Sequence, residues 1–305
     1  MTVAEAIRAA TERLSATSDT ARLDAELLMA HALDASRSDM LLRHMTDIEP
    51  GGFGALVERR AAHEPLAYIT GVQEFFGREF GVTPDVLIPR ADSEVLVEAA
   101  LELATPDARV LDLGTGSGAL LLSFLAEREE STGTGIDASP GATFVALENA
   151  NRLRVNTPLG EDEIARFAYQ LEAAGIDIGK GSLASVPRGR AEFRCLDWNT
   201  GSWRTHLGTF DLIFCNPPYV ETDAKLDPDV RDFEPASALL AGKEGLDDYR
   251  VILPQLRKLM ADNAVAIFEI GATQADSVGR IARNAGFAVE FRNDLANRPR
   301  CAILR

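Results

Sequence analysis

Apolar residues follow helical spacing in the first part of the chain. Between Val3 and Leu14 they lie three or four positions apart, which predicts an amphipathic helix. The alanine- and leucine-rich stretch ARLDAELLMAHAL predicts a second helix, with Asp19 or Thr20 as its N-terminal cap. Residues 1–63 carry no alternating pattern typical of strands, so they are predicted to form a small helical domain.

Residues 64–90 follow a different pattern, rich in aromatic side chains and glycines. Two short segments, Val72–Phe76 and Arg78–Val82, are separated by one glycine and predict a β-hairpin. The stretch VLIPRADSEVLVEAAL then enters a helix, for which Asp92 or Ser93 is the expected cap. We expect the hairpin to link the helical domain to a second domain.

From about residue 91 onward, predicted strands alternate with predicted helices. The strands are expected at Arg109–Leu113, Gly133–Asp137, Glu192–Cys195, Phe210–Cys215, Val265–Glu269, Phe287–Phe291 and Arg300–Leu304. The helices are expected at Ala119–Arg128, Ala142–Arg152, Tyr249–Met260 and Ala275–Ala285. This alternation predicts an α/β domain with a mostly parallel sheet covered on both faces. Because the last two strands are joined by a short connection, we expect an antiparallel edge pair.

The composition is that of a globular protein with a large negative charge. The chain has 305 residues, 46% of them hydrophobic, and its 31 Lys and Arg against 47 Asp and Glu give a formal charge of −16. This length is typical of about two domains, and the hydrophobic content excludes wholesale disorder. Because phosphate binding needs a positive field, the charge disfavours a broad nucleic-acid surface.

Cysteine usage and hydropathy indicate the compartment. Cys195, Cys215 and Cys301 lie far apart with no CxxC pair, so we expect neither a disulfide framework nor a metal site. The sequence has no apolar run long enough for a membrane span, and its N-terminal stretch lacks a signal-peptide pattern. We therefore expect a cytoplasmic protein, with a monomer favoured over an oligomer.

A glycine-rich loop follows the first predicted strand of the α/β region. It consists of Gly114, Thr115, Gly116, Ser117 and Gly118. Glycines let the backbone approach a ligand, and free N–H groups at the start of the next helix bind polar or anionic groups. Asp137 ends the second strand, where an acidic side chain accepts hydrogen bonds from ribose hydroxyls. Together they predict an adenosine-type cofactor; a plain tight turn and a helix cap are the alternatives.

A proline pair follows the strand Phe210–Cys215. The segment consists of Asn216, Pro217, Pro218 and Tyr219. The two prolines fix φ and remove two backbone donors, which leaves carbonyl acceptors beside the Asn216 side chain. Such acceptors suit an NH₂ group, and Tyr219 can pack against a flat amide or base. The alternative is a rigid turn without a ligand.

These motifs together resemble a known family. DLGTGSGAL, GID and NPPYV are similar to class I methyltransferases that use S-adenosylmethionine. More narrowly, most of the chain resembles the HemK/PrmC family of release factor glutamine methyltransferases. The matching stretches are EPLAYITGVQEFFGREFGV, VLIPRADSEVLVE, VLDLGTGSGAL, DLIFCNPPYV, FEPASALLAGKEGLDDYRVI, FEIGATQ and DLANRPRCAI. Family members methylate the side-chain amide nitrogen (N5) of the glutamine in the Gly-Gly-Gln motif of peptide chain release factors.

The resemblance implies an organisation in three parts. Residues 1–63 would form a helical substrate-recognition domain, and residues 64–90 a β-hairpin linker. Residues 91–305 would form a Rossmann-like methyltransferase domain, with a seven-stranded, mostly parallel sheet and an antiparallel edge strand. The implied partner is a release factor, and the implied product of the cofactor is S-adenosylhomocysteine.

The resemblance also implies residue roles. The loop of Gly114, Thr115, Gly116, Ser117 and Gly118 would hold the methionine end of the cofactor, and Asp137 the ribose. Asp197 and Trp198 would lie beside the adenine, although from the residues alone a solvent-facing loop with a packed indole is the simpler reading. Asn216, Pro217, Pro218 and Tyr219 would hold the glutamine, and Asn216 would also lie next to the cofactor.

Two departures from the family pattern stand out. The usual Arg-Pro-Asp-Thr-Glu stretch reads Arg-Ala-Asp-Ser-Glu at residues 90–94, which keeps a hydroxyl but loosens the turn. Between Asp137 and Asp197, roughly thirty residues at about 157–188 look inserted, which is long for such a connection. Residues 164–171 follow amphipathic helical spacing. The insertion is either a surface excursion or a flap near the adenine.

The expected reaction is direct in-line methyl transfer from the sulfonium to the amide nitrogen. Asn216 and the carbonyl of Pro217 would accept the two amide hydrogens, so that positioning supplies most of the catalysis. One alternative is a glutamine methyltransferase that acts on a ribosomal protein. An adenine-N6 methyltransferase of DNA or RNA, which the charge disfavours, and an adaptor that only binds the cofactor are further alternatives. A nicotinamide dehydrogenase would need a different glycine spacing.

Overall fold

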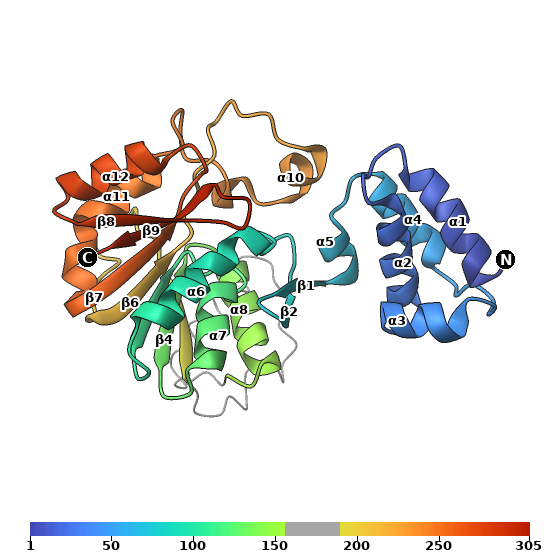
Figure 1. Ribbon diagram of the computed structural model, residues 1–305, viewed down its shortest axis with the longest axis horizontal. Helices are drawn as coiled ribbons and strands as arrows, with labels where there is room; N and C mark the ends of the chain where they lie inside the picture. Colours follow the sequence, from blue (N-terminus) through green and yellow to red (C-terminus); the bar gives the residue numbers. More distant parts are fainter. Residues whose placement is uncertain (156–189) are drawn as a thin grey trace. The chain divides into compact units, whose positions relative to one another are not determined.

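The computed structural model describes residues 1–155 and 190–305 (Figure 1). The insertion predicted at about 157–188, with its expected helix and the suggested flap, lies outside the described residues. The described chain divides into two compact units. One contains Met1–Val72 and Leu226–Glu234, and the other contains Gln73–Lys225 and Pro235–Arg305.

The first unit is a small helical bundle, as the apolar spacing predicts. Its helices are α1 (Val3–Leu14), α2 (Ala21–Ala32), α3 (Arg37–Asp39), α4 (Phe53–Ala61) and α5 (Leu66–Thr70), with a π-helical turn at Met40–His44. α1 packs on α2 and α4 around a core that includes Ile7 and Leu28. A capping box between Thr2 and Glu5 stabilises the start of α1. The short helix α10 (Pro228–Phe233) belongs to this unit as well.

The predicted hairpin is formed by β1 (Val72–Phe75) and β2 (Arg78–Gly81). Its two turn residues, Phe76 and Gly77, both have positive φ angles, of 51° and 69°. The rings of Phe75 and Phe80 pack edge to face with 6.1 Å between their centroids, which stabilises the pair of strands.

The second unit contains one seven-stranded sheet, in the order β5-β4-β3-β6-β7-β9-β8 (Figure 1). Its strands are β3 (Arg109–Leu113), β4 (Thr132–Asp137), β5 (Ala191–Cys195), β6 (Phe210–Cys215), β7 (Met260–Glu269), β8 (Val289–Asn293) and β9 (Pro299–Leu304). The first five are parallel, and β9 runs antiparallel to both β7 and β8. The predicted seven-stranded, mostly parallel sheet with an antiparallel edge strand is therefore confirmed.

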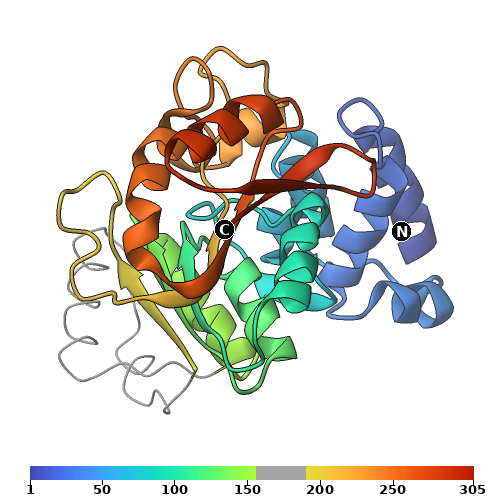
Figure 2. The same ribbon diagram turned by 60° about the vertical axis from the view of Figure 1, so that its left-hand side comes forward.

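Helices cover both faces of this sheet (Figures 1 and 2). They are α6 (Glu94–Leu103), α7 (Ala119–Glu127), α8 (Pro140–Arg152), α11 (Asp247–Leu256) and α12 (Ala275–Asn284). Successive strand residues point to opposite faces. Val110 and Leu212 accordingly join the core beneath α6, α7 and α8, whereas Leu111 and Ile213 join the core beneath α11 and α12. Because the sheet is buried on both faces, its strands consist of nearly continuous apolar residues.

Several boundaries and caps differ from the prediction. The helix expected over Tyr249–Met260 ends at Leu256, because a 3₁₀ turn leads directly into β7, which starts earlier than predicted. Thr20 and Ser93 do occupy cap positions, but neither side chain caps its helix. The Thr20 hydroxyl donates to Asp24, and the Ser93 hydroxyl donates to a carboxylate on β7.

Candidate active site

The glycine loop lies at the carboxyl end of β3, between β4 and β6, where the direction of strand order reverses. Ligands of open parallel sheets bind at this switch point. Gly114, Gly116 and Gly118 all have positive φ angles, of 71°, 54° and 80°, which glycine adopts without strain. A Cβ added to Gly114 would lie 3.1 Å from the ring of Trp198. The Trp198 ring therefore packs closely against the backbone of the loop, and at Gly114 there is no room for a side chain.

The N–H groups of this loop are mostly used within the protein. Those of Gly114 and Thr115 donate to the carbonyl of Ile136, and that of Gly118 donates to Thr115. The N–H of Gly116 donates to Asp137 Oδ2 at 3.0 Å. We expected free N–H groups here that bind polar or anionic groups, but these four are not free, because Ile136 and Asp137 of β4 accept three of them and Thr115 accepts the fourth. The loop can therefore contribute a close backbone surface to a ligand, but these N–H groups contribute little positive potential.

A cavity of about 460 Å³ opens above the loop, a size typical of small-molecule sites. Among the residues with predicted roles, its lining includes Gly114, Thr115, Gly116, Ser117, Asp137, Asp197, Trp198, Asn216 and Pro218. The acidic residues of the lining are Asp85, Asp137, Asp197 and Asp248, against one basic residue, Arg90, within the described chain. A cavity with this balance favours a cationic ligand over a phosphate.

Asp137 bridges the end of β4 and the glycine loop. Besides the N–H of Gly116, its carboxylate accepts the N–H of Ser139 at 2.9 Å. Ser139, not Asp137, is the side-chain cap of α8. Burial raises the pKa of Asp137, and the N–H groups of Ser139 and Gly116 lower it again. Each carboxylate oxygen has further acceptor capacity, so Asp137 can still receive hydrogen bonds from a ligand.

Trp198 covers the loop from the segment that follows β5. Its indole Nε1 donates to Asp248 Oδ1 at 2.7 Å, and Asp248 lies in the first turn of α11. Burial raises the pKa of the Asp248 carboxyl, and the indole N–H lowers it. The Asp197 carboxylate accepts the backbone and side-chain N–H groups of Asn199. The sequence analysis did not identify Asp248 as a site residue. The feature that could have indicated it is the pair of acidic residues at the start of α11.

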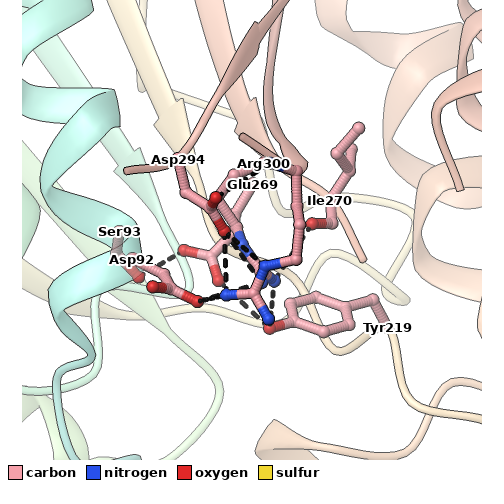
Figure 3. Close-up of polar contacts among 8 residues, drawn as sticks. Asp92, Ser93, Tyr219, Glu269, Ile270, Asp294 and Arg300 are labelled. Atoms are coloured by element: carbon pink, nitrogen blue, oxygen red, sulfur yellow. Dashed lines mark hydrogen bonds and ion pairs between the residues drawn. The ribbon is translucent and has the colours of Figure 1, made fainter. Parts of the chain in front are cut away.

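The proline pair leaves the sheet at the end of β6. Asn216 and Pro218 line the cavity, whereas Gly118, Pro217 and Tyr219 lie outside its lining. The Tyr219 hydroxyl instead points into a polar cluster, where it donates to Glu269 Oε1 at 3.1 Å (Figure 3). Burial and the Glu269 charge raise the pKa of Tyr219, so its hydroxyl keeps its proton.

Asp112 is a buried acid within β3 that sequence reasoning also missed. It is 1% exposed, and the Thr115 hydroxyl donates to its Oδ2 at 2.7 Å. Burial and the charge of Asp137 raise the pKa of Asp112 to about 7. The detectable signal was a charged residue in the centre of an apolar strand.

Comparison with known proteins identifies the family. A family model of the PrmC N-terminal domain matches residues 5–71. A release factor glutamine methyltransferase of Cereibacter sphaeroides is 37% identical over 100% of this chain and 99% of its own length. Proteins of the same name from Vibrio cholerae, 37% identical over 94% and 90%, and Rhodospirillum rubrum, 36% identical over 93% and 78%, are also similar.

The chain belongs to the release factor glutamine methyltransferase family. The resemblance drawn from the motifs is thereby confirmed, and the protein is a methyltransferase. Within this family member, the residues of three motifs that lie far apart in the sequence line one cavity: the glycine loop, the Asp197-Trp198 pair and Asn216 with Pro218. In the two described ranges, no helix is long and apolar enough to cross a membrane.

Proposed function

We propose that this protein transfers a methyl group from S-adenosylmethionine to the side-chain amide nitrogen of the glutamine in the Gly-Gly-Gln motif of peptide chain release factors. The observation that carries the proposal is the position of Asn216. It lines the same cavity as the glycine loop and Asp137, at the end of the neighbouring strand, in a chain of this family. Release factors act in translation, so we also propose that the protein works in the cytoplasm.

The residues present fit S-adenosylmethionine. The cofactor carries a cationic sulfonium and an ammonium group, which suit a cavity with four aspartates in its lining. A nicotinamide dinucleotide would instead bring its pyrophosphate to a loop whose N–H groups are mostly used internally. We propose that the loop Gly114–Gly118 holds the methionine end, that Asp137 receives the ribose hydroxyls and that Trp198 with Asp197 flanks the adenine.

The cofactor supplies an electrophilic methyl group bound to sulfur. In the proposal, the Asn216 side chain and the Pro217 carbonyl accept the two hydrogens of the substrate amide and orient its lone pair in line with that group. A nitrogen–carbon bond forms as the sulfur–carbon bond breaks, and the electron pair stays on sulfur. The nitrogen then loses one proton to solvent. The chain contributes position and oriented acceptors rather than a strong base.

The N-terminal helical unit is the proposed site of release factor recognition. Among the described residues it exposes four large apolar side chains, of which Leu42 and Ile48 are the most exposed, each 82% accessible. Large apolar side chains this exposed are candidates for contact with a protein partner. Replacing Leu42 and Ile48 together by serine should raise KM for the release factor and leave the affinity for S-adenosylmethionine unchanged.

One assay tests the function. The purified protein is incubated with labelled S-adenosylmethionine and, in separate reactions, a full-length release factor, the same factor with the motif glutamine replaced by alanine, ribosomal proteins and DNA. We expect label only in the unaltered release factor, with mass spectrometry placing one methyl group on the motif glutamine. Label in ribosomal protein or DNA and none in the release factor would overturn the proposal.

A further inference from the structure

Tyr219, the last residue of the proline segment, is held at both ends by one stretch of chain. Its hydroxyl donates to Glu269 Oε1 at 3.1 Å, and its main-chain carbonyl accepts from Gln274 Nε2 at 3.0 Å. Glu269 is the last residue of β7, and Gln274 immediately precedes α12. Residues 269–274 therefore form a short brace that spans Tyr219 from side chain to backbone.

The side-chain end of the brace lies in a buried polar cluster (Figure 3). Glu269 is 1% exposed, and its Oε2 accepts the hydroxyl of Ser93. Arg300 Nη1 lies 3.5 Å from the Tyr219 hydroxyl oxygen, and Arg300 Nη2 donates to Asp92 Oδ2 at 3.0 Å. Burial raises the pKa of Glu269, and a guanidinium only donates hydrogen bonds, so Arg300 cannot accept the hydroxyl proton. The Tyr219 hydroxyl consequently donates to Glu269 and faces Arg300 with its lone pairs, which fixes the direction of the ring.

The main-chain end is equally enclosed. Gln274 is 6% exposed; its Oε1 accepts the N–H of Gly271 at 3.0 Å, and its Nε2 also donates to the carbonyl of Gly245 at 3.1 Å. Gly245 has a φ of +64°, and a Cβ added there would lie 2.2 Å from the Tyr219 carbonyl oxygen. That oxygen is already bonded within the protein, which leaves the Asn216 side chain and the proline carbonyls to receive a substrate amide.

The register of the sheet connects the brace to the start of the segment. Cys215 on β6 pairs with Phe268 on β7, so Asn216 and Glu269 leave two adjacent parallel strands at the same level. The segment 216–219 is thus fixed at its first residue by β6 and at its last residue by the brace. Between the two fixed points, the prolines allow little rotation.

We propose that Glu269 and Gln274 are positioning residues for methyl transfer: by fixing Tyr219 they hold the acceptor groups of residues 216–218 in the orientation that receives the glutamine amide. The inference rests on the proposed function, since it assigns these acceptors to the substrate. A shift of about 1 Å in such groups can cost on the order of a hundredfold in rate. Neither Glu269 nor Gln274 has to touch the substrate for this effect.

The test combines turnover with hydrogen exchange. The variants are Tyr219→Phe, Glu269→Ala, Glu269→Gln, Gln274→Met and the double variant Tyr219→Phe/Glu269→Ala. We expect Tyr219→Phe and Glu269→Ala each to lower kcat on a full-length release factor by about 10- to 100-fold, with KM and the Kd for S-adenosylmethionine changed less than about threefold. The double variant should lose no more than the worse single variant, because both single variants remove the hydrogen bond between Tyr219 and Glu269. Glu269→Gln keeps an acceptor oxygen and should restore most of the activity.

The rate of amide hydrogen exchange in the peptide that spans residues 214–222 measures how firmly the brace holds Tyr219, and it needs no substrate. It should exchange faster in Tyr219→Phe, Glu269→Ala and Gln274→Met than in the wild type and in Glu269→Gln. The matched control is Tyr249→Phe, which also removes a hydroxyl bonded to residue 269, there at its main-chain carbonyl at 2.7 Å. This control should leave exchange of the peptide unchanged.

Two results would overturn the inference: unchanged exchange of the peptide in all variants, or losses in kcat that add in the double variant. If Glu269→Ala does not fold, Tyr219→Phe and Gln274→Met decide the same question. A wild-type protein that methylates no release factor would contradict the proposed function instead. In that case, the exchange measurements still determine whether residues 269–274 brace Tyr219.

Discussion

Trp198 and Asp248 are joined by a hydrogen bond of 2.7 Å, although they lie fifty residues apart in the sequence, one after β5 and the other in α11. The bond holds the indole over Gly114, where an added Cβ would touch the ring. The Asp248 carboxylate therefore fixes the position of the Trp198 ring, which in the proposal flanks the adenine.

Replacing Asp248 should weaken cofactor binding through Trp198. In Asp248→Ala the indole loses its acceptor, and we expect the affinity for S-adenosylmethionine to fall by about 1.5–3 kcal/mol, the scale of a hydrogen bond to a charged group. Isothermal titration calorimetry measures this loss. The matched control is Asp247→Ala, which removes the neighbouring, exposed carboxylate. Equal losses in both variants would mean that charge alone, rather than the position of Trp198, controls affinity.

Gly114 and Gly116 make a second matched pair. Both have positive φ angles, so alanine at either position should lower the free energy of unfolding by roughly 1–2 kcal/mol through backbone strain. Only at Gly114 does the new Cβ meet Trp198; at Gly116 nothing in the described protein lies within 4 Å. Gly114→Ala should therefore also shift the tryptophan emission spectrum, and Gly116→Ala should not. Thermal unfolding and fluorescence measure the two effects, and identical spectra would contradict the close contact.

The pKa of Asp112 predicts a pH-dependent stability. Burial raises this pKa from an ordinary value near 4 to about 7, so the folded state binds a proton more tightly than the unfolded state. The contribution to stability is fully present below the unfolded pKa and is lost as the pH rises towards 7. Asp112→Asn can still accept from Thr115 but has no proton to lose. We expect it to gain stability relative to wild type as the pH rises from 5 to 8, on the order of 3 kcal/mol.

Chemical denaturation of both proteins at several pH values provides the measurement. The difference between the two proteins removes the contribution of other titrating groups. A constant difference across this range would show that Asp112 is ionised throughout.

Asn216 and Asp137 should separate catalysis from binding. Asn216→Ala removes a proposed acceptor of the substrate amide and should abolish methylation while the Kd for S-adenosylmethionine stays nearly constant. Asp137→Ala should instead weaken cofactor binding by about 1.5–3 kcal/mol, because a charge-assisted hydrogen bond is lost. Single-turnover assays and calorimetry on the two variants form the test. Activity that survives in Asn216→Ala, or wild-type affinity in Asp137→Ala, would remove the corresponding role.

The sequence allowed the family and the order of the elements to be predicted, because strand–helix alternation and the spacing of the motifs are local signals. The residues that support the site could not be predicted from the sequence. Asp248, Glu269, Gln274 and Arg300 act through partners that only the folded sheet brings near. The glycine loop illustrates the same limit: its glycines were evident, but the internal use of their N–H groups depends on Ile136 and Asp137 from the next strand.

The position of β9 has a consequence for the edge of the sheet and for Tyr219. β8 precedes β9 in the chain but pairs only through it, among the described strands, since β9 lies between β7 and β8. β9 pairs directly with β7, whereas β8 is connected to the rest of the sheet through β9, the strand that also carries Arg300 to Tyr219. Without β9, β8 would have no partner among the described strands, and Tyr219 would keep its bonds to Glu269 and Gln274 but lose its contact with Arg300. The pairing of β9 with β7 therefore connects the edge strand β8 to the sheet and at the same time places Arg300 beside Tyr219.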